Sequence, residues 1–161
     1  MMSEEKMIRL DRMRYTKNVA SAIMCYLSIV FDVLFFVNIY ESDVGTWYYK
    51  ILMGAGIVYN LLFMLAVFLS SEGVKAYKKQ YTVPLILLGA GQIARIFIIP
   101  LQAHNSVVKL SGAETIVMGN GQFILCIIYL SLSALGLFLA ALINYRKSRS
   151  LAEYLNTIAQ R

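Results

Sequence analysis

The chain has 161 residues, of which 59% are hydrophobic and 15% are charged, and its net charge is +6 at pH 7. Soluble domains carry about 45–50% apolar and about 25% charged residues, so the composition excludes an ordinary water-soluble domain, and it is too apolar for a disordered chain. Because a transmembrane helix takes about 20 residues, the length accommodates about four or five spans, and we expect one membrane domain over residues 1–161.

The chain begins with a basic segment that leads into the first apolar run. Residues 1–17 place methionine and leucine between lysine and arginine, which predicts a short amphipathic helix at the membrane interface. The apolar run at residues 19–40 is longer than the core of a signal peptide, and no cleavage motif of small residues follows it. We therefore expect it to stay in the membrane as the first span.

Three further apolar runs follow, at residues 47–69, 83–101 and 123–145. Each is long enough to cross a hydrocarbon core of about 30 Å. The pattern predicts an all-α integral membrane protein, folded as an up-and-down bundle of four transmembrane helices. The connection at residues 102–122 is long for a helix hairpin, and we expect its apolar residues, Met118 among them, to enter the interface or meet an external partner.

The basic residues predict the orientation of the bundle. Residues 1–17, 75–79 and 146–161 together hold 12 of the 15 lysines and arginines. The positive-inside rule therefore places both termini in the cytoplasm, and the compact connections favour a bacterial cytoplasmic membrane. Because these bases flank the membrane, anionic lipid accounts for the charge, and we expect no binding to nucleic acid.

Two charges lie inside the apolar runs. Asp32 in the first span and Arg95 in the third each cost about 2.5–3.5 kcal/mol near the bilayer centre. They fall at similar depths, so an ion pair between them is possible. Gln92 shares a helical face with Arg95, and Asn60 lies in the second span. Two interpretations stay open for this intramembrane polar cluster: it locks the helices together, or it lines a path for a proton or solute.

Small and weakly polar residues recur at helical spacing in the spans. Such faces let transmembrane helices approach closely and form hydrogen bonds across the interface. We therefore predict a helix-packing stripe, within the bundle or against another protein, that consists of Ser21, Cys25, Ser28, Gly56, Ser133, Gly136 and Ala140. The alternative is that these faces line an aqueous path in an oligomer.

The segment at residues 146–161 carries a one-sided apolar stripe. Its members are Leu151, Tyr154, Leu155 and Ile158, at the spacing i, i+3, i+4 and i+7 of one helical face. We predict a short amphipathic helix there, which docks either on the membrane surface or in the groove of a partner.

The chain lacks the motifs of hydrolytic catalysis, and its single histidine, His104, has no second metal ligand nearby in the sequence. We therefore expect no catalytic residues, no metal and no cofactor. The leading hypothesis is a non-enzymatic accessory or structural subunit of a larger membrane assembly, for example an ABC-type importer. Its expected partners are the lipid bilayer and other integral membrane subunits or further copies of itself. The alternative is a small self-associating carrier or channel that uses Asp32, Asn60, Gln92 and Arg95.

Overall fold

The computed structural model describes residues 4–40, 47–105, 107–110, 113–116 and 118–160. Within these residues, four helical segments are long and apolar enough to cross a membrane. They are Val19–Ile39, Ile51–Lys75, Lys79–His104 and Asn120–Ala159. The expectation of an integral membrane protein with four candidate spans is therefore supported by the helices themselves.

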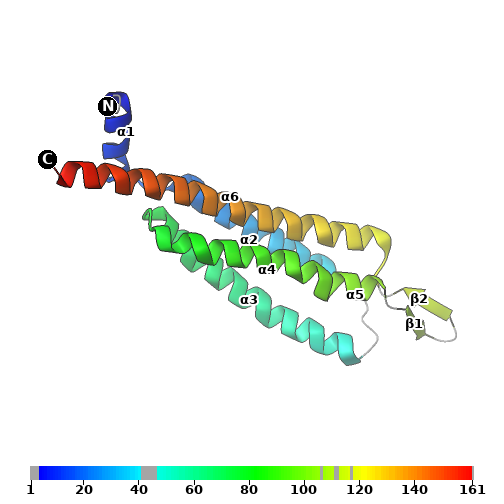
Figure 1. Cartoon of the computed structure of the whole chain (residues 1–161). Helices are drawn as coiled ribbons and strands as arrows, with labels where there is room; N and C mark the ends of the chain where they lie inside the picture. The colour runs from blue at the N-terminus through cyan, green and yellow to red at the C-terminus, as the bar shows by residue number, and fades with distance from the viewer. Residues whose placement is uncertain (1–3, 41–46, 106, 111–112, 117, 161) are drawn as a thin grey trace.

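The elements follow one another along the chain as shown in Figure 1. They are α1 (Glu4–Met13), α2 (Val19–Tyr40), α3 (Trp47–Lys75), the 3-10 helix η1 (Lys79–Tyr81), α4 (Thr82–Ile98), α5 (Pro100–His104), β1 (Val107–Leu110), β2 (Ala113–Ile116) and α6 (Asn120–Ala159). Helix α2 has the bounds that the sequence predicts. Helix α3 continues past the predicted end at residue 69 and reaches Lys75.

The third span is divided at Pro100. Helix α4 ends at Ile98 and α5 begins at Pro100, because proline has no N–H to donate and its ring crowds the carbonyl of the preceding turn. The backbone N–H of Ala103 then donates to the carbonyl of Ile99 at 2.9 Å. The two helices together cover the predicted span at residues 83–101.

Helix α6 is the longest element of the described chain, with 40 residues. At about 1.5 Å per residue it is about 60 Å long, about twice the thickness of a hydrocarbon core. The sequence predicted a span at residues 123–145 and a separate short helix at residues 146–161. That division is wrong for the described residues, because one helix runs through both segments without a break (Figure 1).

Helix α6 also organises the packing. It lies side by side with α2 and with α4, and α3 packs against α2 (Figure 1). In the apolar stretch of α3 only 17% of the residues are buried, against 33% in α2 and 39% in α6. Helix α3 is therefore the most loosely held of the four candidate spans.

The connection before α6 contains the one departure from an all-α fold among the described residues. Strands β1 and β2 pair antiparallel, with Val107 opposite Ile116 and Leu110 opposite Ala113. The prediction for Met118 is also wrong, because its side chain is fully buried against Phe35, Cys126 and Leu130 in the core. Residues 41–46, which connect the first two predicted spans, lie outside the described residues.

Candidate functional site

The intramembrane polar cluster is assembled from α2 and α4. The Asp32 carboxylate accepts two hydrogen bonds at Oδ1, one from Arg95 Nη1 and one from Gln92 Nε2, each 3.0 Å long. Arg95 and Gln92 reach the same carboxylate because the spacing i, i+3 puts them on one face of α4. The structure thus brings together three of the four residues that the sequence singled out.

The Arg95 guanidinium also lies against two aromatic rings. It is 4.5 Å from the ring centroid of Phe35 on α2 and 4.8 Å from that of Tyr59 on α3. A cation held over the face of an aromatic ring is stabilised by the ring quadrupole, most strongly where water is excluded. Neither ring was predicted from the sequence, although Phe35 is three residues from Asp32 and Tyr59 precedes Asn60.

Asn60, the fourth predicted residue, joins the cluster through a cavity instead of a direct hydrogen bond. Asp32 and Asn60 both line a cavity of about 60 Å³, together with Phe36 and Ile57. Asp32 Oδ2, Gln92 Oε1 and both amide atoms of Asn60 are buried and have no hydrogen-bond partner among the described residues. Gln92 does not line this cavity, so the cavity places Asn60 beside Asp32 without supplying hydrogen-bond partners to the buried polar atoms.

The predicted packing stripe forms the interface between α2 and α6. Ser133 Oγ lies 3.0 Å from the carbonyl oxygen of Ser28 and 2.9 Å from Ser28 Oγ. Ser21 Oγ donates to the carbonyl oxygen of Ala140 at 2.7 Å. Hydrogen bonds of this kind join transmembrane helices that have no hydrophobic driving force between them.

Glycine at position 136 allows this close approach. A Cβ atom there would lie 3.1 Å from the carbonyl oxygen of Met24 and 3.4 Å from Ser28 Cβ. Cys25 is fully buried at the same interface. Gly56, by contrast, is separate from the stripe, because a Cβ at that position would contact Ile99.

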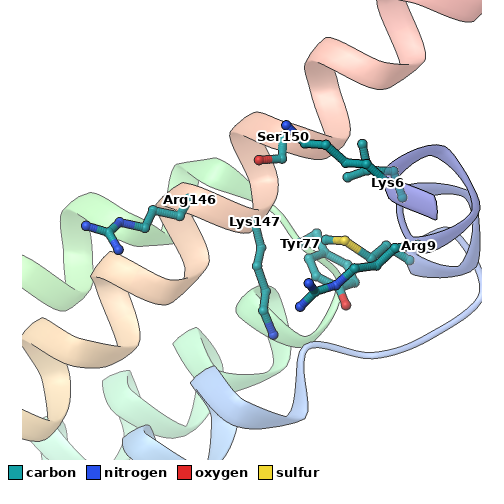
Figure 2. Close-up of a pocket in the computed structure, with 8 residues that line it drawn as sticks. Lys6, Arg9, Tyr77, Arg146, Lys147 and Ser150 are labelled. Atoms are coloured by element: carbon teal, nitrogen blue, oxygen red, sulfur yellow. The ribbon is translucent and has the colours of Figure 1, made fainter. Parts of the chain in front are cut away.

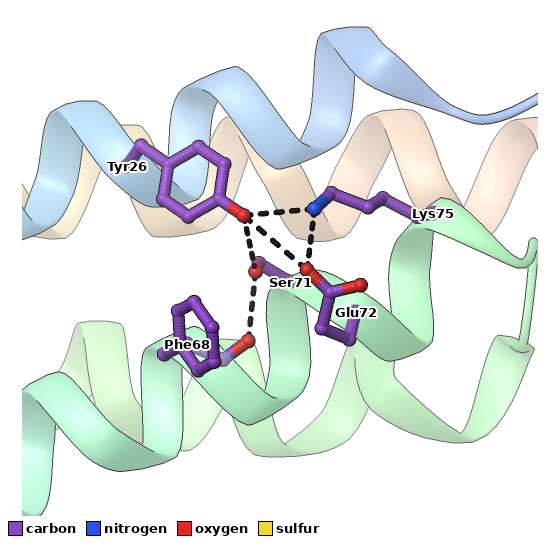
Figure 3. A network of polar contacts seen from close by, with 5 residues as sticks. All are labelled: Tyr26, Phe68, Ser71, Glu72 and Lys75. Atoms are coloured by element: carbon purple, nitrogen blue, oxygen red, sulfur yellow. Dashed lines mark hydrogen bonds and ion pairs between the residues drawn. The ribbon is translucent and has the colours of Figure 1, made fainter.

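A second polar network joins α2 to α3 at one end of the two helices (Figure 3). Lys75 Nζ donates to the Tyr26 hydroxyl at 2.8 Å and forms an ion pair with Glu72. Ser71 Oγ lies 3.3 Å from the same hydroxyl and donates to the Phe68 carbonyl at 2.7 Å. This network was not predicted, because the second span was expected to end at residue 69, which placed Lys75 in the connection.

The predicted docking stripe of the C-terminal segment is divided between two environments. Tyr154 is 7% exposed, and its hydroxyl donates to Asp11 Oδ1 of α1 at 3.2 Å. Arg14, which directly follows α1, lies 5.5 Å from the centroid of the same ring. Leu155 and Ile158 are 40% and 41% exposed, and Leu151 is half-buried. One member of the stripe therefore holds α1, and two face outward.

His104 has a packing contact and a single polar contact. Its ring stacks on Phe123 with a centroid separation of 4.4 Å, and its Nδ1 lies 3.2 Å from the Met118 carbonyl oxygen. Cys25 and Cys126 are both buried free thiols. No group of three or more potential metal ligands occurs among the described residues.

The fold and its buried polar contacts define a helical membrane protein with four candidate spans. Comparison with protein-family models, with curated proteins and with solved structures gives no match to the chain.

Proposed function

We propose that the chain is a non-enzymatic accessory or structural subunit of a larger membrane assembly, such as a transporter complex of the ABC-importer type. In this proposal the four spans form an up-and-down bundle in a bacterial cytoplasmic membrane, with both termini in the cytoplasm. The distribution of lysine and arginine supports that orientation, since 12 of the 15 bases lie in the segments assigned to the cytoplasmic side.

The extension of α6 is the observation that carries the proposal. Residues 146–159 continue the helix beyond the apolar part of the span, about 20 Å at about 1.5 Å per residue. Leu155 and Ile158 lie one turn apart on it and are both about two-fifths exposed. A rigid helix that presents adjacent apolar side chains outside the membrane suits docking into the groove of a partner.

The state of the buried charge supports a structural role. The Asp32 carboxylate is hydrogen-bonded and ion-paired within the chain, so it is compensated by Arg95 instead of being free to exchange a cation. The cavity beside it measures about 60 Å³, which is small beside the roughly 300–1,000 Å³ of typical ligand sites.

Helix α3 offers a second surface for a partner within the bilayer. Leu61, Leu62, Leu65 and Leu69 are all more than half exposed along it. Lipid tails cover such a face as well as protein does, so packing and small residues decide where helices associate. Gly54 is a small residue on α3 at which a partner helix could approach closely, because nothing in the described chain lies within 4 Å of the position that a Cβ atom would take there.

Isolation of the chain from its own cells in a mild detergent tests this proposal. The tagged chain is purified at its natural expression level, and the proteins bound to it are identified and quantified by mass spectrometry. We expect an integral membrane protein to co-purify with the chain in a fixed ratio. Recovery of the chain alone, or of a self-oligomer, contradicts it.

The unsatisfied polar atoms favour a second candidate, a small self-associating carrier or channel. Asp32 and Asn60 line the same cavity and both carry buried side-chain atoms without a hydrogen-bond partner among the described residues, and a neighbouring copy could extend that cavity into a path. In this case Asp32→Asn abolishes solute or ion flux in reconstituted vesicles while the chain still folds. A structural pair predicts instead that Asp32→Asn loosens the fold, and that vesicles with the wild-type chain show no flux.

A further inference from the structure

A basic pocket lies where α1, the turn after α3, and α6 meet (Figure 2). It has a volume of about 280 Å³. Its polar lining consists of Lys6, Arg9, Tyr77, Arg146, Lys147 and Ser150. Four of these side chains are cationic, and no carboxylate lines the pocket among the described residues.

The side chains converge from separate elements. In Figure 2, Lys6 and Arg9 extend from α1 toward α6, and the Arg9 guanidinium lies near the Tyr77 hydroxyl. Lys147 extends from α6 past Tyr77, and its ammonium group donates to Asn18, whereas the Arg146 guanidinium points away from Tyr77. The Lys6 ammonium thus lies near Ser150 and the Arg9 guanidinium near the Tyr77 hydroxyl, while Lys147 and Arg146 complete the basic lining from α6.

The backbone holds Tyr77 in place for this arrangement. Its φ of 55° lies in the left-handed region, which non-glycine residues rarely adopt. The N–H groups of Tyr77 and Lys78 donate to the carbonyls of Val74 and Gly73, at 3.1 Å and 3.3 Å, and so close the end of α3. This turn directs the tyrosine away from α3 and toward α1.

The positive charge of the pocket is not neutralised within the described chain. Lys6, Arg9 and Arg146 have no ion-pair partner there, and Lys147 donates one hydrogen bond to Asn18 Oδ1 at 3.1 Å. The carboxylate of Asp11 on α1 is instead bound to Arg14 and to the Tyr154 hydroxyl. Cations placed this close repel one another, and an anion between them removes that repulsion.

We propose that this pocket binds a phosphate-bearing anion. Arginine and lysine donate short, charge-assisted hydrogen bonds to phosphate oxygens, and the tyrosine and serine hydroxyls add neutral donors. The volume suits one phosphorylated headgroup or a small phosphate ester. Basic pockets beside transmembrane helices on the cytoplasmic side are typical sites for anionic lipid headgroups, and a soluble phosphate ester offers the same chemistry.

Titration of the purified full-length chain in a neutral maltoside detergent tests the proposal. The probes are short-chain phosphatidylglycerol, glycerol phosphate without acyl chains, and short-chain phosphatidylcholine, and the apparent Kd of each is measured. Lys6→Gln with Arg9→Gln is the test variant, since both side chains are exposed and the fold does not depend on them. Arg12→Gln with Lys17→Gln removes the same charge from exposed positions outside the pocket and serves as the control.

We expect the wild-type chain to bind an anionic probe and the test variant to bind it at least tenfold more weakly, while the control variant stays within about twofold of the wild type. Tight binding of phosphatidylglycerol alone identifies a lipid headgroup, and equal binding of glycerol phosphate identifies a soluble ester. No binding of either anionic probe, or an equal loss in the test and control variants, overturns the proposal.

Discussion

The Asp32 carboxylate on α2 and the Arg95 guanidinium on α4 form a buried ion pair at 3.0 Å, with side chains that are 1% and 7% exposed. Both helices pack mainly against α6, so this pair joins two elements that are otherwise linked through a third. Aromatic rings on α2 and α3 cover the guanidinium. The pair therefore connects three of the four candidate spans.

Removal of either charge is expected to destabilise the fold. Arg95→Ala or Asp32→Ala leaves its partner buried and unpaired, which typically costs about 3–5 kcal/mol. The double variant leaves no buried charge, so we expect its loss to be clearly smaller than the sum of the two single losses. The free energy of unfolding in detergent measures this, with Val37→Ala at an exposed position of α2 as the control. Additive losses would show that the two side chains do not interact.

Gly136 is expected to tolerate no large side chain. A Cβ at this position already meets a backbone oxygen of α2 at 3.1 Å, so Gly136→Leu must push α2 and α6 apart. We expect a loss of about 1–3 kcal/mol, the usual effect of overpacking. Gly54→Leu on α3 is the matched control, because nothing lies within 4 Å of its Cβ position. Equal melting temperatures of the two variants would contradict the close helix contact.

The two serines between α2 and α6 are expected to contribute unequally. Ser133 Oγ donates to the Ser28 carbonyl and lies within hydrogen-bond distance of Ser28 Oγ, so Ser133→Ala removes two contacts and Ser28→Ala removes one. Hydrogen bonds between membrane helices average about 0.6 kcal/mol, with a maximum near about 1.7 kcal/mol. We expect Ser133→Ala to cost more than Ser28→Ala in unfolding measurements. The reverse order would reject this arrangement of donors.

Tyr154 is expected to control the attachment of α1. Tyr154→Ala removes the hydrogen bond to Asp11 and the ring beneath Arg14, which are contacts that tie α1 to α6. Amide hydrogen exchange across residues 4–13 should then accelerate, because the helix opens locally more often. Exchange in α2 and α4 should be unchanged. Tyr154→Phe, which keeps the ring, should have an intermediate effect, and unaltered exchange in α1 with Tyr154→Ala would contradict the contact.

The candidate spans were predictable because about 20 consecutive apolar residues have few alternatives to a membrane helix. The Asp32–Arg95 pair was predictable for a related reason, since two isolated charges at similar depth in apolar helices need a partner. Helical spacing predicted which faces of α2 and α6 carry the serines, although it did not predict that Ser28 and Ser133 contact each other. These features depend on local pattern and on the bilayer.

Features that depend on packing between distant segments were not predictable. Nothing in the sequence stops α6 at residue 145, since Arg146 and Lys147 are good helix formers and the apolar pattern simply gives way to a polar one. The contacts of Arg95 with Phe35 and Tyr59 require the relative rotation of three helices. The burial of Met118 and the β1–β2 hairpin likewise depend on how the connection folds back on the helices.

The most direct test of the proposed role is the effect of the exposed apolar pair on α6 upon complex formation. The chain is isolated from its own cells in mild detergent as the wild type, as Leu155→Ser with Ile158→Ser, and as Ile8→Ser, which removes an exposed apolar side chain from α1. We predict a stoichiometric membrane partner with the wild type and with Ile8→Ser, and its loss with the double variant at unchanged chain stability. An unchanged partner with the double variant, or no partner with the wild type, would contradict the account.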